Sequence, residues 1–157
     1  MTRTVCIALS ETAPAISGIH WAFDNVCQNG DNVVVVMAIK SEADRAKHTQ
    51  ETKDLVCFLA NQSANIKYKV EVVVASSSAG AAIVDFVAGL KPDTLVVTPF
   101  SKLAADIAKK DAEFCRENAS CAVVVAPVGA TEEASAESFL TKAALKGMLF
   151  KPKVNWF

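Results

Sequence analysis

Short runs rich in Val, Ile, Leu and Ala recur along the chain, and most of them show no alternation of apolar with polar residues. Strands that are buried on both faces of a parallel sheet have this pattern. A segment with helical spacing of apolar residues follows each of the first four runs, so strand and helix alternate along the chain. We therefore predict five parallel strands, over residues 5–9, 33–39, 70–75, 95–97 and 122–126.

The four predicted helices differ in how clearly their ends are marked. For the first helix, Thr12 is a suitable N-cap, Pro14 fits the first turn, and Gly30 fits the left-handed residue after a helix end. The third helix is stopped at Pro92. We expect the fourth helix to lie half exposed, because its apolar and charged residues are mixed. The predicted apolar faces are Ile16, Ile19, Phe23, Val26 and Cys27; Leu55, Val56 and Leu59; Ile83, Phe86, Val87 and Leu90; and Leu103, Ile107, Phe114 and Cys115.

The chain has 157 residues, of which 52% are hydrophobic and 21% are charged, so it can bury a core as one domain. We predict an α/β domain over residues 1–127 and a helical C-terminal tail over residues 128–157. The tail holds more large apolar side chains than a free tail needs, so we expect it to pack on its own domain or across a dimer. These side chains are Phe139, Leu140, Leu149, Phe150, Trp156 and Phe157.

The formal net charge is −1 and no basic stripe is present, so nucleic acid is not an expected partner. The longest apolar run, residues 33–39, is far shorter than the roughly 20 residues of a membrane-spanning helix. The amino-terminal residues have the pattern of a first strand and lack the cleavage site of a signal peptide. We expect a cytoplasmic protein without membrane contact.

The residue types that carry catalysis or bind metals are scattered. The five cysteines form no C-x-x-C pair, which favours buried, reduced thiols over disulfides or a zinc site. His20 in the first helix and His48 in a predicted polar connector have no catalytic partner nearby in sequence. No G-x-S-x-G, P-loop or H-E-x-x-H motif occurs. We therefore expect no enzyme activity; a weak phosphatase or nucleotide hydrolase is the least supported alternative.

A ligand site is predicted from the fold class, because open α/β sheets bind ligands beyond the carboxyl ends of the strands, where the strand order reverses. The loops that leave the predicted strands are rich in hydroxyl groups. We interpret the serine run at residues 76–78 first as a helix N-cap and second as a phosphate contact. The candidate nucleotide or anion cleft comprises Ser10, Ala38, Ser76, Thr98, Ser101, Lys102 and Lys109.

Three segments carry a resemblance to a known family. They are Trp-Ala-Phe-Asp-Asn at residues 21–25, Gly-Asp-Asn-Val-Val-Val at 30–35, and Ala-Ser-Cys-Ala-Val-Val-Val at 119–125. With them, roughly residues 3–127 of the chain resemble the universal stress protein domain. The resemblance implies a three-layer α/β/α sandwich of the adenine nucleotide alpha hydrolase-like type. Its doubly wound parallel sheet would have five strands in the order 3-2-1-4-5.

The resemblance is to members of the family that lack the ATP-binding glycine motif. The nucleotide-binding members have an Asp at the end of the first strand and a Gly-x-x-Gly followed, after a spacer, by Gly-Ser or Gly-Thr. Here Ser10 stands in place of the Asp, and Thr-Pro-Phe-Ser at residues 98–101 stands in place of Gly-x-x-Gly. Pro99 has no N–H to donate to a phosphate. We therefore expect no cofactor, with a variant site for AMP, ATP or another anion as the alternative.

Family members without the motif pair their last strands edge to edge, and the resemblance implies the same here. The last predicted strand is flat and apolar, and such an edge aggregates unless it is paired or covered. We expect a homodimer through Cys121, Val123 and Val125. The implied function is a non-catalytic role in stress response or signalling, through homodimerisation and binding of protein partners.

Overall fold

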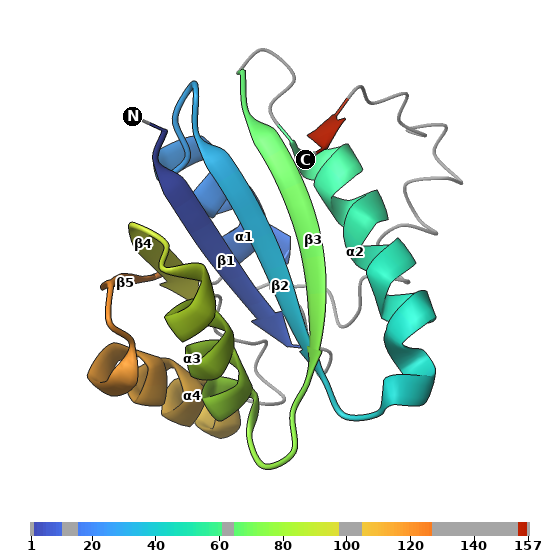
Figure 1. Cartoon of the computed structure of the whole chain (residues 1–157), viewed down its shortest axis with the longest axis vertical. Coiled ribbons are helices and arrows are strands. Elements are labelled where there is room, and N and C mark those ends of the chain that lie inside the picture. Colours follow the sequence, from blue (N-terminus) through green and yellow to red (C-terminus); the bar gives the residue numbers. More distant parts are fainter. Residues whose placement is uncertain (1, 11–15, 61–64, 98–104, 127–153, 157) are drawn as a thin grey trace.

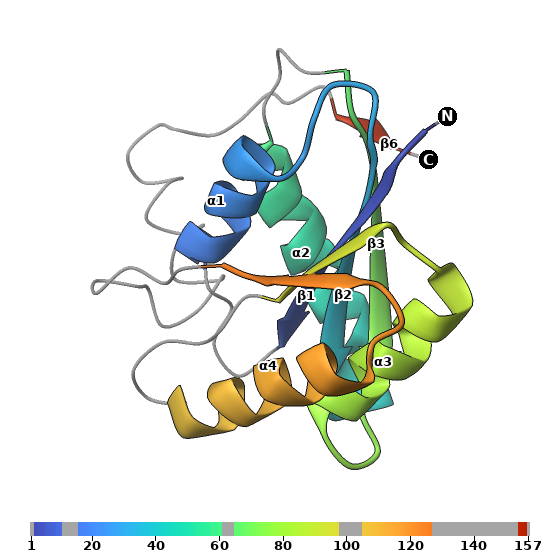
Figure 2. The same cartoon turned by 90° about the vertical axis from the view of Figure 1, so that its left-hand side faces the viewer.

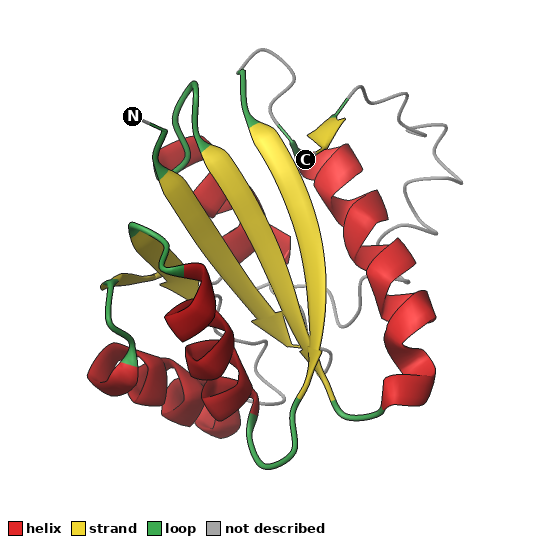
Figure 3. Ribbon diagram, viewed as in Figure 1, coloured by secondary structure: helices red, strands yellow, loops and turns green. Residues whose placement is uncertain are grey.

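The computed structural model describes residues 2–10, 16–60, 65–97, 105–126 and 154–156 of the chain (Figure 1). Strands and helices alternate along it as predicted, around one central sheet (Figure 3). The elements are β1 (Thr4–Ser10), α1 (Ile16–Asn25), β2 (Asn32–Ile39), the 3₁₀ turn η1 (Glu42–Asp44), α2 (Arg45–Leu59), β3 (Lys67–Val74), α3 (Ala79–Leu90), β4 (Thr94–Val97), α4 (Ala105–Asn118), β5 (Ala122–Val125) and β6 (Asn155–Trp156).

The described strands form one parallel sheet in the order β5-β4-β1-β2-β3-β6. The predicted order 3-2-1-4-5 is therefore confirmed for the five predicted strands. The predicted number of strands is wrong by one, because β6 adds to the edge of β3 and places Asn155 beside Lys67 and Trp156 beside Tyr68. A strand of two residues has no hydrophobic period, so no sequence pattern predicts it.

Two hydrophobic cores lie on opposite faces of the sheet, because successive residues of a strand point to opposite faces. Odd-numbered residues of β1 and β2, such as Ile7, pack with α1 and α2. Even-numbered residues, such as Ala8, pack with α3 and α4. Figure 2 shows α3 and α4 next to each other on their side of the sheet. This arrangement confirms the predicted three-layer α/β/α sandwich.

The ends of α3 agree with the sequence analysis. The Ser78 hydroxyl accepts a hydrogen bond from the Ala81 N–H at 3.1 Å, so the last serine of the 76–78 run caps the helix. At the other end, Lys91 adopts a left-handed conformation, with φ of 53°, directly before Pro92. The cap predicted for the first helix at Thr12 and the proline at residue 14 lie outside the described residues.

Three local predictions are corrected. Helix α1 ends at Asn25, well before Gly30, so Gly30 is not its C-terminal cap and instead takes a φ of +92° in the turn before β2. His48 lies in α2, not in a connector. Phe114 is 39% exposed, because α4 turns Cys115 rather than Phe114 toward the core.

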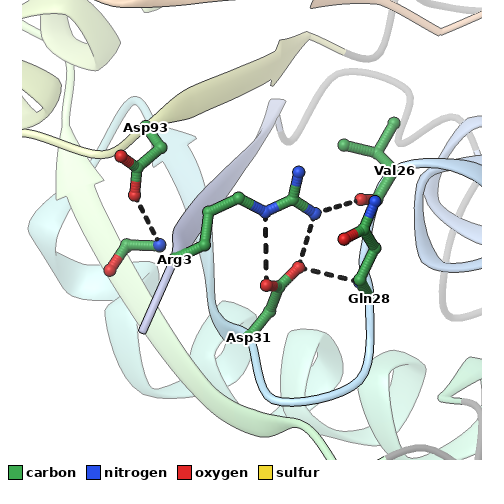
Figure 4. Close-up of polar contacts among 6 residues, drawn as sticks. Arg3, Val26, Gln28, Asp31 and Asp93 are labelled. Atoms are coloured by element: carbon green, nitrogen blue, oxygen red, sulfur yellow. Dashed lines mark hydrogen bonds and ion pairs between the residues drawn. The ribbon is translucent and has the colours of Figure 1, made fainter. Parts of the chain in front are cut away.

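A part-buried ion pair joins the amino-terminal ends of the strands (Figure 4). Arg3 donates from Nη2 to Asp31 Oδ2 at 2.6 Å and from Nε to Oδ1 at 3.2 Å, and Nη2 also donates to the Val26 carbonyl at 2.5 Å. Asp31 accepts a further hydrogen bond from the Gln28 N–H at 2.7 Å. Beside this pair, the Asp93 carboxylate accepts a hydrogen bond from the Thr4 N–H at 2.8 Å. The hydrogen bond to Asp31 raises the pKa of Arg3. This Arg3–Asp31 cluster lies at the amino-terminal ends of the strands, whereas the predicted ligand site lies at their carboxyl ends, so its role is structural.

All five cysteines are free thiols, but only three of them are core residues. Cys6, Cys27 and Cys115 are buried, whereas Cys57 and Cys121 are partly exposed. Burial is the main cause that raises the pKa of Cys27 to about 12, and burial also raises the pKa of Cys6. The thiols of Cys6 and Cys27 therefore stay protonated, and all three buried cysteines pack as small hydrophobic groups.

The end of the chain lies against its own domain through β6. Besides its pairing with β3, Trp156 has Lys53 Nζ at 5.8 Å from its ring centre. Residues 127–153 and Phe157 lie outside the described residues, so the predicted boundary at residue 127 and the predicted helical character of the tail stay predictions. Within the described part of the chain, none of the helices is long and apolar enough to cross a membrane.

Candidate functional site

The sheet reverses its strand order between β1 and β4. From β1 the chain proceeds outward through β2 and β3, returns through α3 to β4, and proceeds outward again to β5 on the other side. The carboxyl ends of β1 and β4, at Ser10 and Val97, therefore flank the point at which open α/β sheets bind ligands. This is the position that the sequence analysis assigned to the cleft.

Three of the predicted cleft residues, Ser10, Ala38 and Ser76, lie at or just after the carboxyl ends of described strands. Ser10 and Ala38 are neighbours in register on β1 and β2. The Ala38 side chain is 2% exposed and packs in the core with α3 and α4, so it contributes a buried methyl group rather than a polar contact. Ser76 is exposed in the loop between β3 and α3, two residues before the capping Ser78. The structure therefore brings Ser10 and Ala38 together and leaves Ser76 on the next loop.

The remaining predicted cleft residues fall in and after the loop that follows β4. Thr98, Ser101 and Lys102 lie outside the described residues. The backbone of Lys109 belongs to the first half of α4, but its side chain is not among those described. The predicted roles of these four residues in binding a phosphate stay predictions.

An ion pair on the β2–α2 connection was missed by the sequence analysis. Arg45 donates from Nε and Nη2 to the two carboxylate oxygens of Glu42, each at 2.8 Å, and from Nη1 to the Val72 carbonyl at 2.5 Å. These bonds lower the pKa of Glu42 and raise that of Arg45. The spacing of three residues is a signal for such a pair on a helical turn. Because Val72 belongs to β3, the pair fixes this connection to the strand beside it.

The two histidines have acidic neighbours on their own helices. His20 Nε2 lies 3.3 Å from Asp24 Oδ2 on α1, and His48 Nδ1 lies 3.5 Å from Glu51 Oε2 on α2. Both pairs have the one-turn spacing common on helix surfaces. Across the residues that the structure describes, no group of three or more His, Cys, Asp or Glu side chains is placed to hold a metal ion.

Among the described residues, the outer edge of β5 has no strand partner. In the described sheet β5 pairs only with β4, and Ala126 N donates to the Val97 carbonyl at 3.0 Å. In a parallel strand, the N–H and C=O of one residue point to the same side, and alternate residues point to opposite sides. The backbone groups of Val123 and Val125 therefore point away from β4. Val125 is also 37% exposed, and Cys121, directly before the strand, is partly exposed.

Comparison with known proteins gives matches in structure but not in sequence. No protein-family model matches the chain, and no curated protein sequence matches it. A universal stress protein in complex with cAMP has a TM-score of 0.57 and 15% identity, over 82% of this chain and 98% of that one. The universal stress protein from Archaeoglobus fulgidus has a TM-score of 0.55 and 15% identity, over 81% and 95%. A universal stress protein family protein from Arabidopsis thaliana with AMP bound has a TM-score of 0.54 and 16% identity, over 82% and 93%.

These three similarities cover most of each chain and agree with the resemblance found in the sequence. At identities near 15%, the similarity shows a shared fold but not a shared ligand, because function depends on the residues of the site rather than on the fold. The chain therefore has the universal stress protein fold.

Proposed function

We propose that this chain acts as a non-catalytic homodimeric module of the universal stress protein type, which works through contacts with protein partners in a stress response. The observation that carries the proposal is the outer edge of β5, which has no strand partner in the part of the sheet that the structure describes. Its outward N–H and C=O groups, at Val123 and Val125, are those that a second strand would pair with. The sequence supports the absence of catalysis, since it contains no nucleophile motif and no P-loop.

A two-fold axis at this edge would pair the two β5 strands antiparallel and extend the sheet across the dimer. The strand has only four residues, so backbone pairing alone gives few hydrogen bonds. Helix α4 lies next to β5 at the same edge (Figure 1), and its Phe114 side chain is 39% exposed. We propose that Phe114 supplies apolar contact area to the interface, because large exposed aromatic groups are typical interface anchors.

The test of the dimer is light scattering on the full chain at high micromolar concentration. The wild type should have twice the mass of one chain, and Val125→Lys should be a monomer, because a lysine on an edge strand disfavours pairing. Val74→Lys is the matched control, since Val74 is a valine at the end of β3 with 39% exposure. A monomeric wild type, or a Val125→Lys variant that stays dimeric, would contradict the proposal.

A second candidate function is the sensing of an adenine nucleotide at the switch point. Two of the similar structures contain cAMP or AMP, and this chain has serine at the end of β1. The phosphate would be bound by the hydroxyl groups of Ser10 and Ser101 and the ammonium group of Lys102, in place of a glycine loop.

Calorimetric titration with AMP and with ATP in Mg²⁺ tests this second function. Saturable heat that disappears in the double variant Ser101→Ala, Lys102→Ala would support it. Lys91→Ala is a control for the loss of a lysine, because Lys91 lies just before the start of β4, at the amino-terminal ends of the strands and away from the switch point. The absence of heat from the wild type, or unchanged affinity in the double variant, would reject it.

A further inference from the structure

A tight turn leads from α1 into β2, and its two central residues are Asn29 and Gly30. The Asp31 N–H donates to the Gln28 carbonyl at 3.0 Å, which closes the turn over them. Gly30 has a φ of +92° at the third position, as a type II turn requires. Both central residues are exposed, so water reaches the turn.

An asparagine that precedes glycine can react with its own main chain. The Gly30 amide nitrogen, once it has lost its proton, attacks Asn29 Cγ; a C–N bond forms, ammonia leaves, and the product is a cyclic succinimide. Water then opens the ring at either carbonyl and gives aspartate or isoaspartate, so the net change is uptake of water and release of ammonia. Glycine favours the attack because it has no Cβ to hinder the approach. No other asparagine in the sequence precedes a glycine.

The structure holds both reacting groups through the main chain of Asn65, just before β3. Asn29 Oδ1 accepts a hydrogen bond from the Asn65 N–H at 2.6 Å, which fixes the asparagine side chain. The Gly30 N–H donates to the Asn65 carbonyl at 2.7 Å. The proton that the Gly30 nitrogen must lose is therefore engaged, and this bond has to open before the nitrogen can attack. The folded turn thus restrains a reaction that its sequence favours.

The same turn is connected to the Arg3–Asp31 cluster. The Gln28 N–H donates to Asp31 Oδ2 at 2.7 Å, and this oxygen also accepts from Arg3. Isoaspartate at residue 29 would lengthen the main chain by one methylene group inside the closed turn. The main-chain hydrogen bonds across the turn could not then keep their geometry. Modification at this position is therefore expected to loosen the cluster.

We propose that Asn29 is a site of spontaneous deamidation, and that the rate of this modification is set by the opening of the Asn65 contacts. A chain whose turn opens often is modified sooner, and the modified turn is held less firmly. The inference is independent of the proposed dimer and of the nucleotide site, because these residues lie at the amino-terminal ends of β2 and β3.

The experiment is incubation of the full chain near neutral pH, in buffer and in urea, with aspartate and isoaspartate at residue 29 quantified by peptide mass spectrometry. Conversion in buffer should be slower than in urea by about ten-fold or more, because hydrogen bonds must break to open the turn. Amide exchange at Gly30 in the folded chain should be slowed by a similar factor, because both reactions need the same proton to leave. Absence of conversion in urea, equal or faster conversion in buffer, or an unprotected Gly30 amide would overturn the inference.

Variants at Asn65 separate its main-chain contacts from its side chain. Asn65→Pro removes the N–H that binds Asn29 and keeps the carbonyl that binds Gly30, so conversion in buffer should accelerate by about three-fold or more. Asn65→Ala is the matched control, because it keeps both main-chain groups, and its rate should equal that of the wild type. A thermal melt of each variant checks that it is folded. Equal rates in folded Asn65→Pro and Asn65→Ala would contradict the restraint.

Discussion

Removal of the Asp31 carboxylate is expected to destabilise the fold strongly although it lies far from the predicted ligand site. Asp31 is 5% exposed and accepts three hydrogen bonds, two from Arg3 and one from the Gln28 N–H. A hydrogen bond to a charged group contributes about 1.5–3 kcal/mol, and an orphaned buried charge costs still more. The Arg3 side chain, however, is 34% exposed and keeps its bond to the Val26 carbonyl, so water compensates part of the loss.

We therefore expect Asp31→Ala to lower the free energy of unfolding by about 2–3 kcal/mol, and the Tm by about 5–10 °C for a chain of this length. Urea denaturation gives the free energy and a thermal melt gives the Tm. Asp24→Ala is the matched control: Asp24 is exposed and forms an exposed ion pair with His20 on its own helix, so the change should stay within about 0.5 kcal/mol. An Asp31→Ala variant as stable as Asp24→Ala would refute the structural role of the Arg3–Asp31 cluster.

The remaining predictions concern a helix end and the thiols. Lys91→Gly should raise the free energy of unfolding by about 1 kcal/mol, as measured by urea denaturation. Lys91 has a φ of 53°, and a residue with a Cβ is unfavourable in this left-handed conformation whereas glycine is not. A loss of stability in this variant would contradict the prediction. With an aromatic disulfide reagent near pH 8, the partly exposed Cys57 and Cys121 should react before Cys27. Its pKa is raised to about 12, mainly by burial, so its thiolate becomes abundant only as the pH approaches that value; early reaction of Cys27 would contradict its burial.

The strands and helices were predictable because local hydrophobic spacing specifies them. The apolar runs of β1 and β2 and the stop of α3 before Pro92 are visible within a few residues of sequence. Long-range polar contacts have no such signal. Arg3 and Asp31 are 28 positions apart, and Asp31 follows a glycine in what reads as an ordinary turn. The exposed position of Phe114 was missed because Phe114 and Cys115 are adjacent apolar residues, and the sequence does not tell which of the two faces the core.

The switch point of the sheet was predictable from the sequence, whereas the surroundings of the side chains near it were predictable only in part. The switch-point rule locates Ser10 correctly at the end of β1. It does not tell which neighbours turn their side chains into a cleft, and Ala38 is in fact a core residue. The Glu42–Arg45 pair was missed because its third contact, the Val72 carbonyl, depends on the packing of β3 beside the β2–α2 connection. For Thr98, Ser101 and Lys102 the sequence remains the basis of the prediction.

Pairing of β5 with β5 of a second copy is the central claim, and amide hydrogen exchange tests it most directly. The N–H groups of Val123 and Val125 point away from β4, whereas that of Val124 points toward β4 and serves as a control within the same strand. We predict slow exchange at all three amides at high protein concentration, and loss of protection at Val123 and Val125 alone on dilution. Unprotected amides at Val123 and Val125 at high concentration, with Val124 still protected, would contradict the dimer.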